Sequence, residues 1–293
     1  MGVPPLVHLS PLDSTYPSRL RRLARPPSTL TIGGGSLEAA RAVAVVGSRE
    51  AHGEAAEFAH KLAVTLARAQ IVVVSGGALG IDAAAHRGAL DGGGRTWAVA
   101  GTGHERCFPE QHSDLYDSIA AGPGAMVWPF APATEARGGN FVARNRVLVA
   151  LSDAVVVVQA GPLSGALNAA DWATKLRVPL WVVPAPPWLG PGFDGSRGLL
   201  DQGRARALQS VDSLLSSLAP QGPSGALPPP PRPLSAGESA VLEATSSVPL
   251  HLDEIALRAQ SPAPAVLASL LTLALENVVV EGPPGFFRRQ PAP

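Results

Sequence analysis

The stretch IVVVSGGALGIDAAAH, residues 71–86, determines how the rest of the chain is expected to fold. Ile71–Val74 are β-branched residues with no polar face, which is typical of a strand buried on both sides. Ser75-Gly76-Gly77 then predicts a tight turn, and Gly80-Ile81-Asp82 opens an alanine-rich helix. Such a turn leaves backbone N–H groups and the positive end of the helix dipole pointing outward. It is either an anion site, usually for phosphate, or an ordinary connection, and this stretch alone leaves both open.

Similar apolar runs recur along the chain and alternate with helical segments. Continuous apolar runs predict strands covered on both faces, and their alternation with helices predicts right-handed crossovers and a parallel sheet. We therefore predict an α/β fold, a doubly wound (extended Rossmann-like) parallel sheet over residues 41–216. The expected strands are 41–46, 71–74, 96–100, 125–128, 154–158 and 179–183, and the expected helices include 54–69, 113–121, 141–151 and one that ends at Lys175.

The remaining segments differ in composition from this central domain. Residues 1–40 are expected to form an irregular lead-in packed on the core, with the basic segment Tyr16–Leu23 interpreted as a solvated face rather than a packed helix. Residues 217–234 are rich in proline and predict a semi-rigid linker. Beyond it, three short helices over 237–245, 252–259 and 264–276 and a hairpin over 277–289 predict a small winged-helix-like domain at 235–293.

Composition excludes several classes of protein. The 293 residues carry 23 Lys and Arg against 23 Asp and Glu, so no global basic field indicates a nucleic-acid partner. Arginine outnumbers lysine strongly; it suits phosphate contacts, but we attribute the bias to a GC-rich genome, which the Ala, Gly and Pro content also favours. A single cysteine, Cys107, supports neither a disulfide framework nor a cysteine zinc site, and no metal is expected. Without a leader or an apolar run near 18 residues, we expect a cytoplasmic protein with no membrane partner.

The carboxyl ends of the predicted strands carry the residues expected to bind a ligand, because open parallel sheets bind ligands at that edge. Small and hydroxyl residues at these ends let backbone amides approach a ligand closely. The convergence of four such loops on one edge predicts a site for phosphate or a nucleotide backbone. The loops are Gly47-Ser48-Arg49, Ser75-Gly76-Gly77, Gly101-Thr102-Gly103 and 161–165 with Ser164 and Gly165.

The first of these loops argues against a dinucleotide site. Arg49 stands where GxGxxG needs its second glycine, and Ser75 holds the position where an acidic residue would close the next strand. A cationic side chain suits a phosphate oxygen instead. Arg49 is interpreted as a phosphate ligand, with an ion pair to Glu50 or Glu54 as the alternative.

The segment Arg144-Asn145-Arg146 supplies further candidates. The two arginines lie about 200° apart on a helix, so only one of them can share the ligand side with Asn145. Asp82 and His86 lie four residues apart on one helical face but are interpreted as a helix-start residue and a packing residue rather than an acid–base pair. We predict no catalytic residue, no enzymatic activity and no cofactor.

These residues together resemble the DNA-processing protein A (DprA/Smf) family over nearly the whole chain. The resemblance rests on an early Tyr-Pro-Ser-Arg-Leu and a later Pro-Pro, on the long glycine-to-histidine motif, on an Arg-Asn-Arg motif and on shorter matches between them. The matching segments are 16–20, 26–27, 46–49, 75–86, 88–90, 108–109, 141–147 and 164–167.

The resemblance implies an extended Rossmann domain that binds single-stranded DNA and loads the RecA recombinase onto it, in natural transformation and recombination of incoming DNA. It also implies a homodimer, no known enzymatic step and a C-terminal winged-helix domain. By motif position it implies that the DNA pocket is lined by Gly47, Ser48, Arg49, Gly76, Gly77, Arg144, Asn145 and Arg146.

The chain departs from the family pattern in three places. Val127-Trp128 stands where the family usually has Ser-Glu, Val158-Gln159-Ala160 where it has Val-Glu-Ala, and Val183-Pro184-Ala185 where it has Val-Pro-Gly. The loss of two acidic residues is not expected to weaken phosphate binding. The third helix of the winged-helix-like domain, 264–276, contains no Lys or Arg, which favours protein contact or dimerisation over the recognition of duplex DNA.

Two other functions remain open from the sequence. A nucleotide phosphoribohydrolase of the lysine-decarboxylase-like (LOG) family uses a related sheet, but the glutamate of its glycine motif is missing from the segment 161–169. A nucleotide-sensing module without turnover would keep the same pocket and bind no DNA.

Overall fold

The computed structural model describes residues 6–184, 191–218, 235–246, 248–275, 278–281 and 285–289. The chain divides into two compact units, residues 1–219 and 220–293. The proline-rich linker predicted over 217–234 lies outside the described residues from 219 onward, and residues 217 and 218 end helix α8 (Val211–Leu218).

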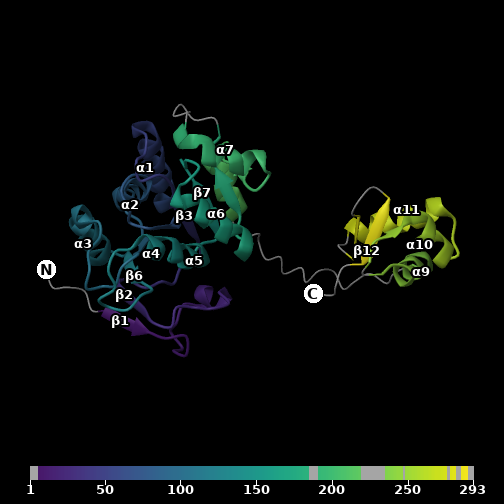
Figure 1. The fold of residues 1–293 in the computed structure, drawn as a ribbon, viewed down its shortest axis with the longest axis horizontal. Helices are drawn as coiled ribbons and strands as arrows, with labels where there is room; N and C mark the ends of the chain where they lie inside the picture. The colour runs from purple at the N-terminus through teal and green to yellow at the C-terminus, as the bar shows by residue number, and fades with distance from the viewer. Residues whose placement is uncertain are drawn as a thin grey trace. The chain divides into compact units, whose positions relative to one another are not determined.

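A nine-stranded sheet forms the centre of the first unit (Figure 1). Its order is β1-β2-β6-β5-β4-β3-β7-β8-β9; the strands from β6 to β9 in this order are parallel, and β2 and β1 are added antiparallel at one edge. The predicted doubly wound α/β fold is confirmed. The strands are β1 (Leu6–Leu9), β2 (Leu30–Gly34), β3 (Ala42–Val46), β4 (Val72–Ser75), β5 (Thr96–Val99), β6 (Ala125–Trp128), β7 (Ala154–Val157), β8 (Leu180–Val182) and β9 (Arg206–Ala207).

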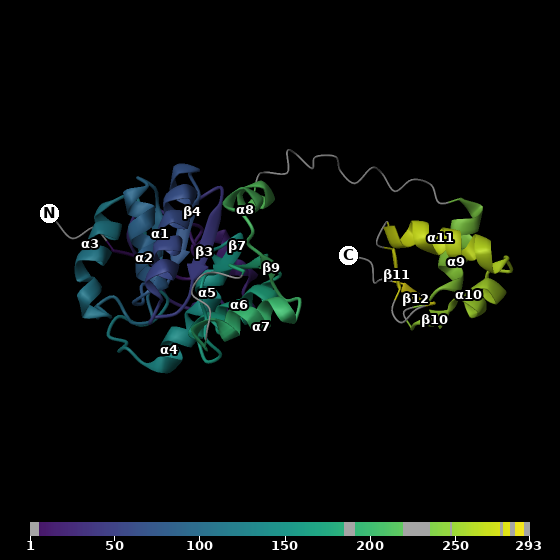
Figure 2. The same ribbon diagram turned by 90° about the horizontal axis from the view of Figure 1, so that it is seen from above.

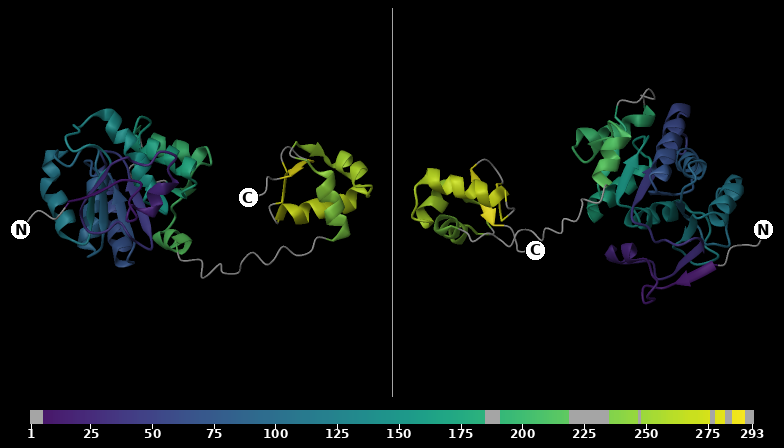
Figure 3. Two further views of the ribbon diagram at one scale, coloured as in Figure 1. Left: turned by 90° about the horizontal axis from the view of Figure 1, so that it is seen from below. Right: turned by 180° about the vertical axis from the view of Figure 1, so that it is seen from behind.

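Helices cover both faces of this sheet, as the views in Figure 2 and Figure 3 show. Alternate residues of β3 point into opposite cores: Val43 and Val45 pack with α1, α2 and α8, whereas Ala44 and Val46 pack with α5 and α6. Strands β3, β4 and β7 are entirely buried because both of their faces are covered. The helices are α1 (Gly53–Arg68), α2 (Ile81–Asp91), α3 (Ser113–Ala121), α4 (Gly138–Ala143), α5 (Asn145–Ala150), α6 (Gly165–Leu176) and α7 (Asp194–Asp201), with 3-10 turns η1 (Ser18–Arg22), η2 (Glu110–His112) and η3 (Pro191–Phe193).

The strand order reverses at β3. The chain runs from β3 outward through β4, β5 and β6, and then returns to place β7, β8 and β9 on the other side of β3. The loops that follow β3 and β7 therefore diverge to opposite faces of the sheet. A crevice at such a switch point is the usual ligand site of open α/β sheets.

The basic lead-in differs from its expected structure. Instead of a solvated face, η1 packs on the end of α5: Arg19 donates to the carbonyl of Leu151 at 3.2 Å and to Asp153 at 2.7 Å. Arg22 donates to the carbonyls of Val149, Ala150 and Ser152. The prediction of an irregular, solvated segment was wrong because the last carbonyls of a helix have no partner within the helix and accept these arginines. It also missed β1 and β2.

The helix predicted over 141–151 is two shorter helices. Helix α4 ends at Ala143 and α5 begins at Asn145, with Arg144 between them. The backbone N–H groups of Val147 and Leu148 both bond to the Arg144 carbonyl, at 2.9 and 3.1 Å. The break places Arg144 where its side chain enters the protein interior.

The second unit has the predicted winged-helix architecture. Its helices are α9 (Ala236–Ala244), α10 (Leu252–Arg258) and α11 (Ala263–Leu275), and its strands are β10 (Leu250–His251), β11 (Val279–Glu281) and β12 (Phe286–Arg289) in the order β10-β12-β11. Strand β10 was not predicted. The three helices and the hairpin enclose a separate apolar core that contains Val241, Ile255, Leu270 and Phe287.

Candidate functional site

A cavity of about 630 Å³ lies at the switch point, between the carboxyl ends of β3 and β7. We call it the switch-point cavity. Its walls come from the loop after β3, from α4 and the start of α5, and from the loop that leads into α6. Seven of the predicted site residues line it: Gly47, Ser48, Arg49, Arg144, Asn145, Ser164 and Gly165.

The loop after β3 is held tightly against the start of α2. The N–H of Ser48 donates to the Gln159 carbonyl at 2.7 Å, and the N–H of Ile81 donates to the Ser48 carbonyl at 3.1 Å. A Cβ added at Gly47 would lie 2.9 Å from the Gln159 carbonyl oxygen, so this close approach requires glycine. The loop therefore presents its backbone at a fixed position on the cavity wall.

Arg49 extends from this loop as an exposed side chain. Its guanidinium lies over the ring of Phe141, 4.9 Å from the ring centroid. It forms no ion pair with Glu50 or Glu54, which are both among the described residues. Arg49 thus brings a positive charge to an aromatic face at the cavity, and Phe141 is a cavity residue that the sequence analysis did not single out.

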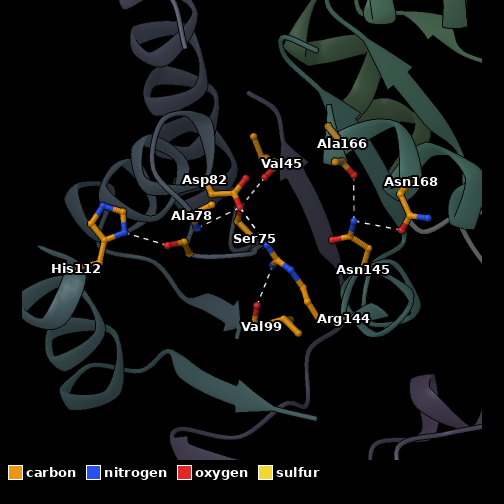
Figure 4. Close-up of polar contacts among 12 residues, drawn as sticks. Val45, Ser75, Ala78, Asp82, Val99, His112, Arg144, Asn145, Ala166 and Asn168 are labelled. Carbon is orange, nitrogen blue, oxygen red and sulfur yellow. Dashed lines mark hydrogen bonds and ion pairs between the residues drawn. The ribbon is translucent and has the colours of Figure 1, made fainter. Parts of the chain in front are cut away.

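Arg144 supplies a second cation, which is buried and lines the cavity. Its Nη1 donates to the Val99 carbonyl at 2.8 Å, and its Nη2 lies 3.5 Å from Oδ2 of Asp82 (Figure 4). The Nε of Arg144 is buried with no hydrogen-bond partner among the described residues. Burial lowers the pKa of the Arg144 guanidinium, and the Asp82 carboxylate opposes this shift.

Asp82 is the counter-ion of this arginine rather than only a helix-start residue. It also accepts a hydrogen bond from the N–H of Ala78 at 3.3 Å. Burial raises the pKa of Asp82, whereas the nearby Arg144 charge and the hydrogen bonds lower it. The pair was not predicted because Asp82 and Arg144 are 62 positions apart in the sequence.

The turn Ser75-Gly76-Gly77 is not among the residues that line the cavity, so its predicted contact with a ligand stays a prediction. All three residues are buried. A Cβ at Gly76 would overlap the Arg144 guanidinium, and one at Gly77 would lie 2.6 Å from the Tyr116 hydroxyl oxygen. The glycines leave room for protein side chains, so the arginine occupies the space that was assigned to an anion.

Asn145 connects α5 to the start of α6. Its Nδ2 donates to the Gly165 carbonyl at 3.0 Å and to Oδ1 of Asn168 at 3.3 Å (Figure 4). Ser164 caps α6 by accepting a hydrogen bond from the N–H of Ala166 at 3.3 Å. The positive end of this 12-residue helix is therefore fixed on the cavity wall, where it favours a negatively charged ligand.

Arg146 lies away from the cavity. Its Nη1 donates to the Arg25 carbonyl of the lead-in. This confirms that Arg144 and Arg146 do not face the same way; Arg146 is not among the cavity-lining residues, and its contact with DNA stays a prediction. The motif therefore contributes one arginine to the cavity and one to packing.

His86 is a packing residue, as predicted. Its Nδ1 lies 2.6 Å from Oγ1 of Thr96, and the Thr96 hydroxyl donates to the Val73 carbonyl at 2.8 Å. The threonine oxygen must then accept from Nδ1–H, which leaves Nε2 as the unprotonated nitrogen, buried without a partner. Burial lowers the pKa of His86 to about 3.

Other kinds of site are not found in the part of the chain that the structure describes. It contains no group of three or more His, Cys, Asp or Glu residues arranged to hold a metal ion. Among the same residues, no helix is long and apolar enough to span a membrane.

Comparison with known proteins identifies related families and structures. The family model described as DNA recombination-mediator protein A matches residues 8–219, and the model of a DprA winged helix domain matches residues 225–285. Protein Smf of Synechocystis sp. is 34% identical over 215 residues; the match covers 72% of this chain and 53% of that protein, so this chain spans about half of the relative's length.

Two solved structures share the fold of the first unit. DNA processing protein A of Streptococcus pneumoniae is 32% identical, with a TM-score of 0.67, and the match covers 72% of this chain and 74% of that one. DNA processing protein A of Helicobacter pylori, whose structure was determined for its single-stranded DNA binding mode, is 28% identical, with a TM-score of 0.65. That match covers 73% of this chain and 95% of the other.

Proposed function

Because the chain belongs to the DNA recombination-mediator protein A family, we propose that it binds single-stranded DNA and loads the RecA recombinase onto incoming DNA during natural transformation and recombination. The observation that carries this proposal is Arg49 stacked on Phe141 at the mouth of a cavity with the buried Arg144 at its base. Proteins that bind single strands combine cations along the backbone with aromatic rings on which bases stack. The single-stranded DNA binding mode of the Helicobacter pylori relative supports the same assignment.

The switch-point cavity supports binding rather than a reaction. Two buried polar side chains of the cavity wall are held by contacts within the protein. Arg144 bonds to the Val99 carbonyl and pairs with Asp82, and Asn145 donates to the Gly165 carbonyl and to Asn168. Two carboxylate side chains line the cavity. Asp82 is engaged by Arg144 and Ala78 and has no free general-base geometry, and Glu50 is exposed to solvent. We therefore propose a protein without enzymatic activity.

The partners follow from the family resemblance. RecA and a second copy of the chain are the proposed protein partners. In the winged-helix unit, α11 carries no Lys or Arg, while Val248, Leu257, Leu267 and Phe286 are exposed apolar side chains. This composition supports a role in protein contact or dimerisation rather than in reading duplex DNA.

The proposal is tested by fluorescence anisotropy with a labelled oligo(dT) strand, competed separately by unlabelled duplex DNA and by thymidine monophosphate. We expect the protein to bind the labelled strand tightly. Neither competitor should displace the strand when its nucleotide concentration equals that of the labelled oligo(dT). Displacement by the mononucleotide would favour a nucleotide-sensing module, and release of free base from a nucleoside monophosphate would favour a phosphoribohydrolase. RecA loading is tested by the RecA ATPase rate on DNA coated with single-strand-binding protein, which we expect this protein to accelerate.

A further inference from the structure

Three aromatic side chains gather at the carboxyl end of β6, on the side of the sheet away from β7. The ring centroids of His8 and His104 are 5.4 Å apart, and those of His104 and Trp128 are 6.1 Å apart in an edge-on arrangement. We call His8, His104 and Trp128 the edge cluster. His8 is exposed, and the other two residues are partly exposed.

The sheet register holds this cluster together. Thr31 of β2 is paired with His8 on one side and with Trp128 on the other, and its hydroxyl lies 3.0 Å from Nδ1 of His8. A Cβ added at Gly33 would lie 3.0 Å from Cζ3 of Trp128, so the indole lies close against the backbone of β2. Strand pairing therefore sets the positions of His8 and Trp128, and His104 comes from the loop after β5.

One loop connects the edge cluster to the switch-point cavity. A Cβ at Gly101 would overlap the ring of Phe141, the cavity residue beneath Arg49, and His104 follows three positions later. Three residues of chain span at most about 11 Å. Phe108 of the same loop contacts Phe141 with ring centroids 5.3 Å apart. The same loop therefore carries one aromatic ring at the cavity, Phe108, and one in the edge cluster, His104.

The side chains of this loop indicate what the edge cluster would bind. Arg106 and Glu105 are both exposed and carry opposite charges, so this pair adds no net charge beside the edge cluster. Rings without excess positive charge suit the stacking of bases better than the binding of a bare phosphate.

We propose that the edge cluster is a second base-stacking subsite for the same DNA strand whose backbone occupies the switch-point cavity. This inference rests on the proposed function. A strand too short to leave the cavity would not reach the cluster, whereas a longer strand would place an unpaired base against Trp128 and His104. Stacking on aromatic side chains accepts every base, so the subsite would extend the footprint without adding sequence preference.

The test measures the affinity of the full chain for oligo(dT) strands of about 4 to about 16 nucleotides, a range that covers typical single-strand sites. With Trp128→Leu we expect unchanged binding of the shortest strands and about tenfold weaker binding of the longest, which corresponds to ~1.4 kcal/mol. Trp172→Leu is the matched control, because Trp172 is partly exposed on α6 and contacts Lys175 outside the edge cluster.

A second measurement locates the contact directly. Oligo(dT) with single 5-iododeoxyuridine substitutions is irradiated in the wild-type complex, and the cross-linked peptides are identified by mass spectrometry. We expect cross-links to the peptide that contains Trp128 or His104 at a strand position distinct from the one that reaches Phe141. Equal loss of affinity at all lengths, or no loss at any length, would overturn the inference. If wild-type protein binds no oligonucleotide, the proposed function itself fails.

Discussion

The guanidinium of Arg144 lies 3.5 Å from the carboxylate of Asp82, and both side chains are more than nine-tenths buried, at 6% and 7% exposure. The pair joins the helix that starts after the glycine turn to the segment between α4 and α5. Because a buried charge is stable only with a partner, Asp82 keeps Arg144 at the base of the switch-point cavity.

Removing the negative charge of Asp82 should therefore destabilise the first unit. We expect Asp82→Asn to lower the free energy of unfolding by about 3 kcal/mol, because the substitution leaves a buried guanidinium without its counter-ion. Urea denaturation followed by circular dichroism measures the change. Asp91→Asn is the matched control: Asp91 pairs with His60 at 2.7 Å on the surface, and its loss should cost less than about 1 kcal/mol. Equal stabilities of the two variants would contradict this role of Asp82.

The glycine at position 76 is predicted to be required for the same reason. A methyl group there would overlap the Arg144 guanidinium, which could move away only by giving up its bonds to Val99 and Asp82. We expect Gly76→Ala to lower the free energy of unfolding by about 2 kcal/mol.

Gly53→Ala provides the comparison for this substitution. Gly53 is exposed at the start of α1, and a Cβ there would meet nothing within 4 Å. The unfolding midpoint of this variant should stay the same or rise, because alanine favours a helix. A Gly76→Ala protein as stable as Gly53→Ala would show that the floor of the cavity is not tightly packed.

His86 predicts an acid-sensitive component of stability. Its pKa of about 3 in the folded protein lies below the ordinary value of 6.5, so between these two values the unfolded chain binds more protons. Stability is therefore fully present above about pH 6.5 and falls as the pH decreases, by about 2 kcal/mol at pH 5 from this group alone.

The variant His86→Asn isolates this component. An asparagine amide can donate to Thr96 in place of Nδ1 but does not titrate. We expect its free energy of unfolding to fall less than that of the wild type between pH 7 and pH 5. The same decrease in both proteins would mean that other groups cause the acid sensitivity.

The sheet could be predicted from the sequence because its strands are continuous apolar runs with glycine turns between them. The strands predicted from Ile71–Val74, Ala125–Trp128 and Ala154–Val158 all occur within one residue of the expected limits. Strands β1 and β2 were missed because His8 and Thr31 interrupt their apolar residues and prolines lie nearby in the sequence. Strand β1 pairs with β2, and β2 pairs with the distant β6, which local sequence does not reveal.

The candidate site could be predicted only in part. Gly47, Ser48 and Arg49 follow a recognisable strand, so their place at the carboxyl edge was accessible from the sequence. The turn Ser75-Gly76-Gly77 has the same local signature but is covered by Arg144 and Tyr116, which come from other segments of the chain. Local pattern identifies a turn that can admit an anion; tertiary packing decides whether a ligand or a side chain occupies it.

The central claim, that Arg49 and the switch-point cavity hold the backbone of a single DNA strand, is tested most directly by salt-dependent binding. The affinity of the wild type, of Arg49→Ala and of Arg68→Ala for an oligo(dT) strand is measured by anisotropy over a series of salt concentrations. Arg68 is an exposed arginine at the far end of α1 from the cavity loop. For Arg49→Ala we expect about tenfold weaker binding and a log–log salt slope smaller in magnitude by about 0.7, since one phosphate contact is lost. Arg68→Ala should match the wild type. An unchanged affinity and slope for Arg49→Ala would contradict the account.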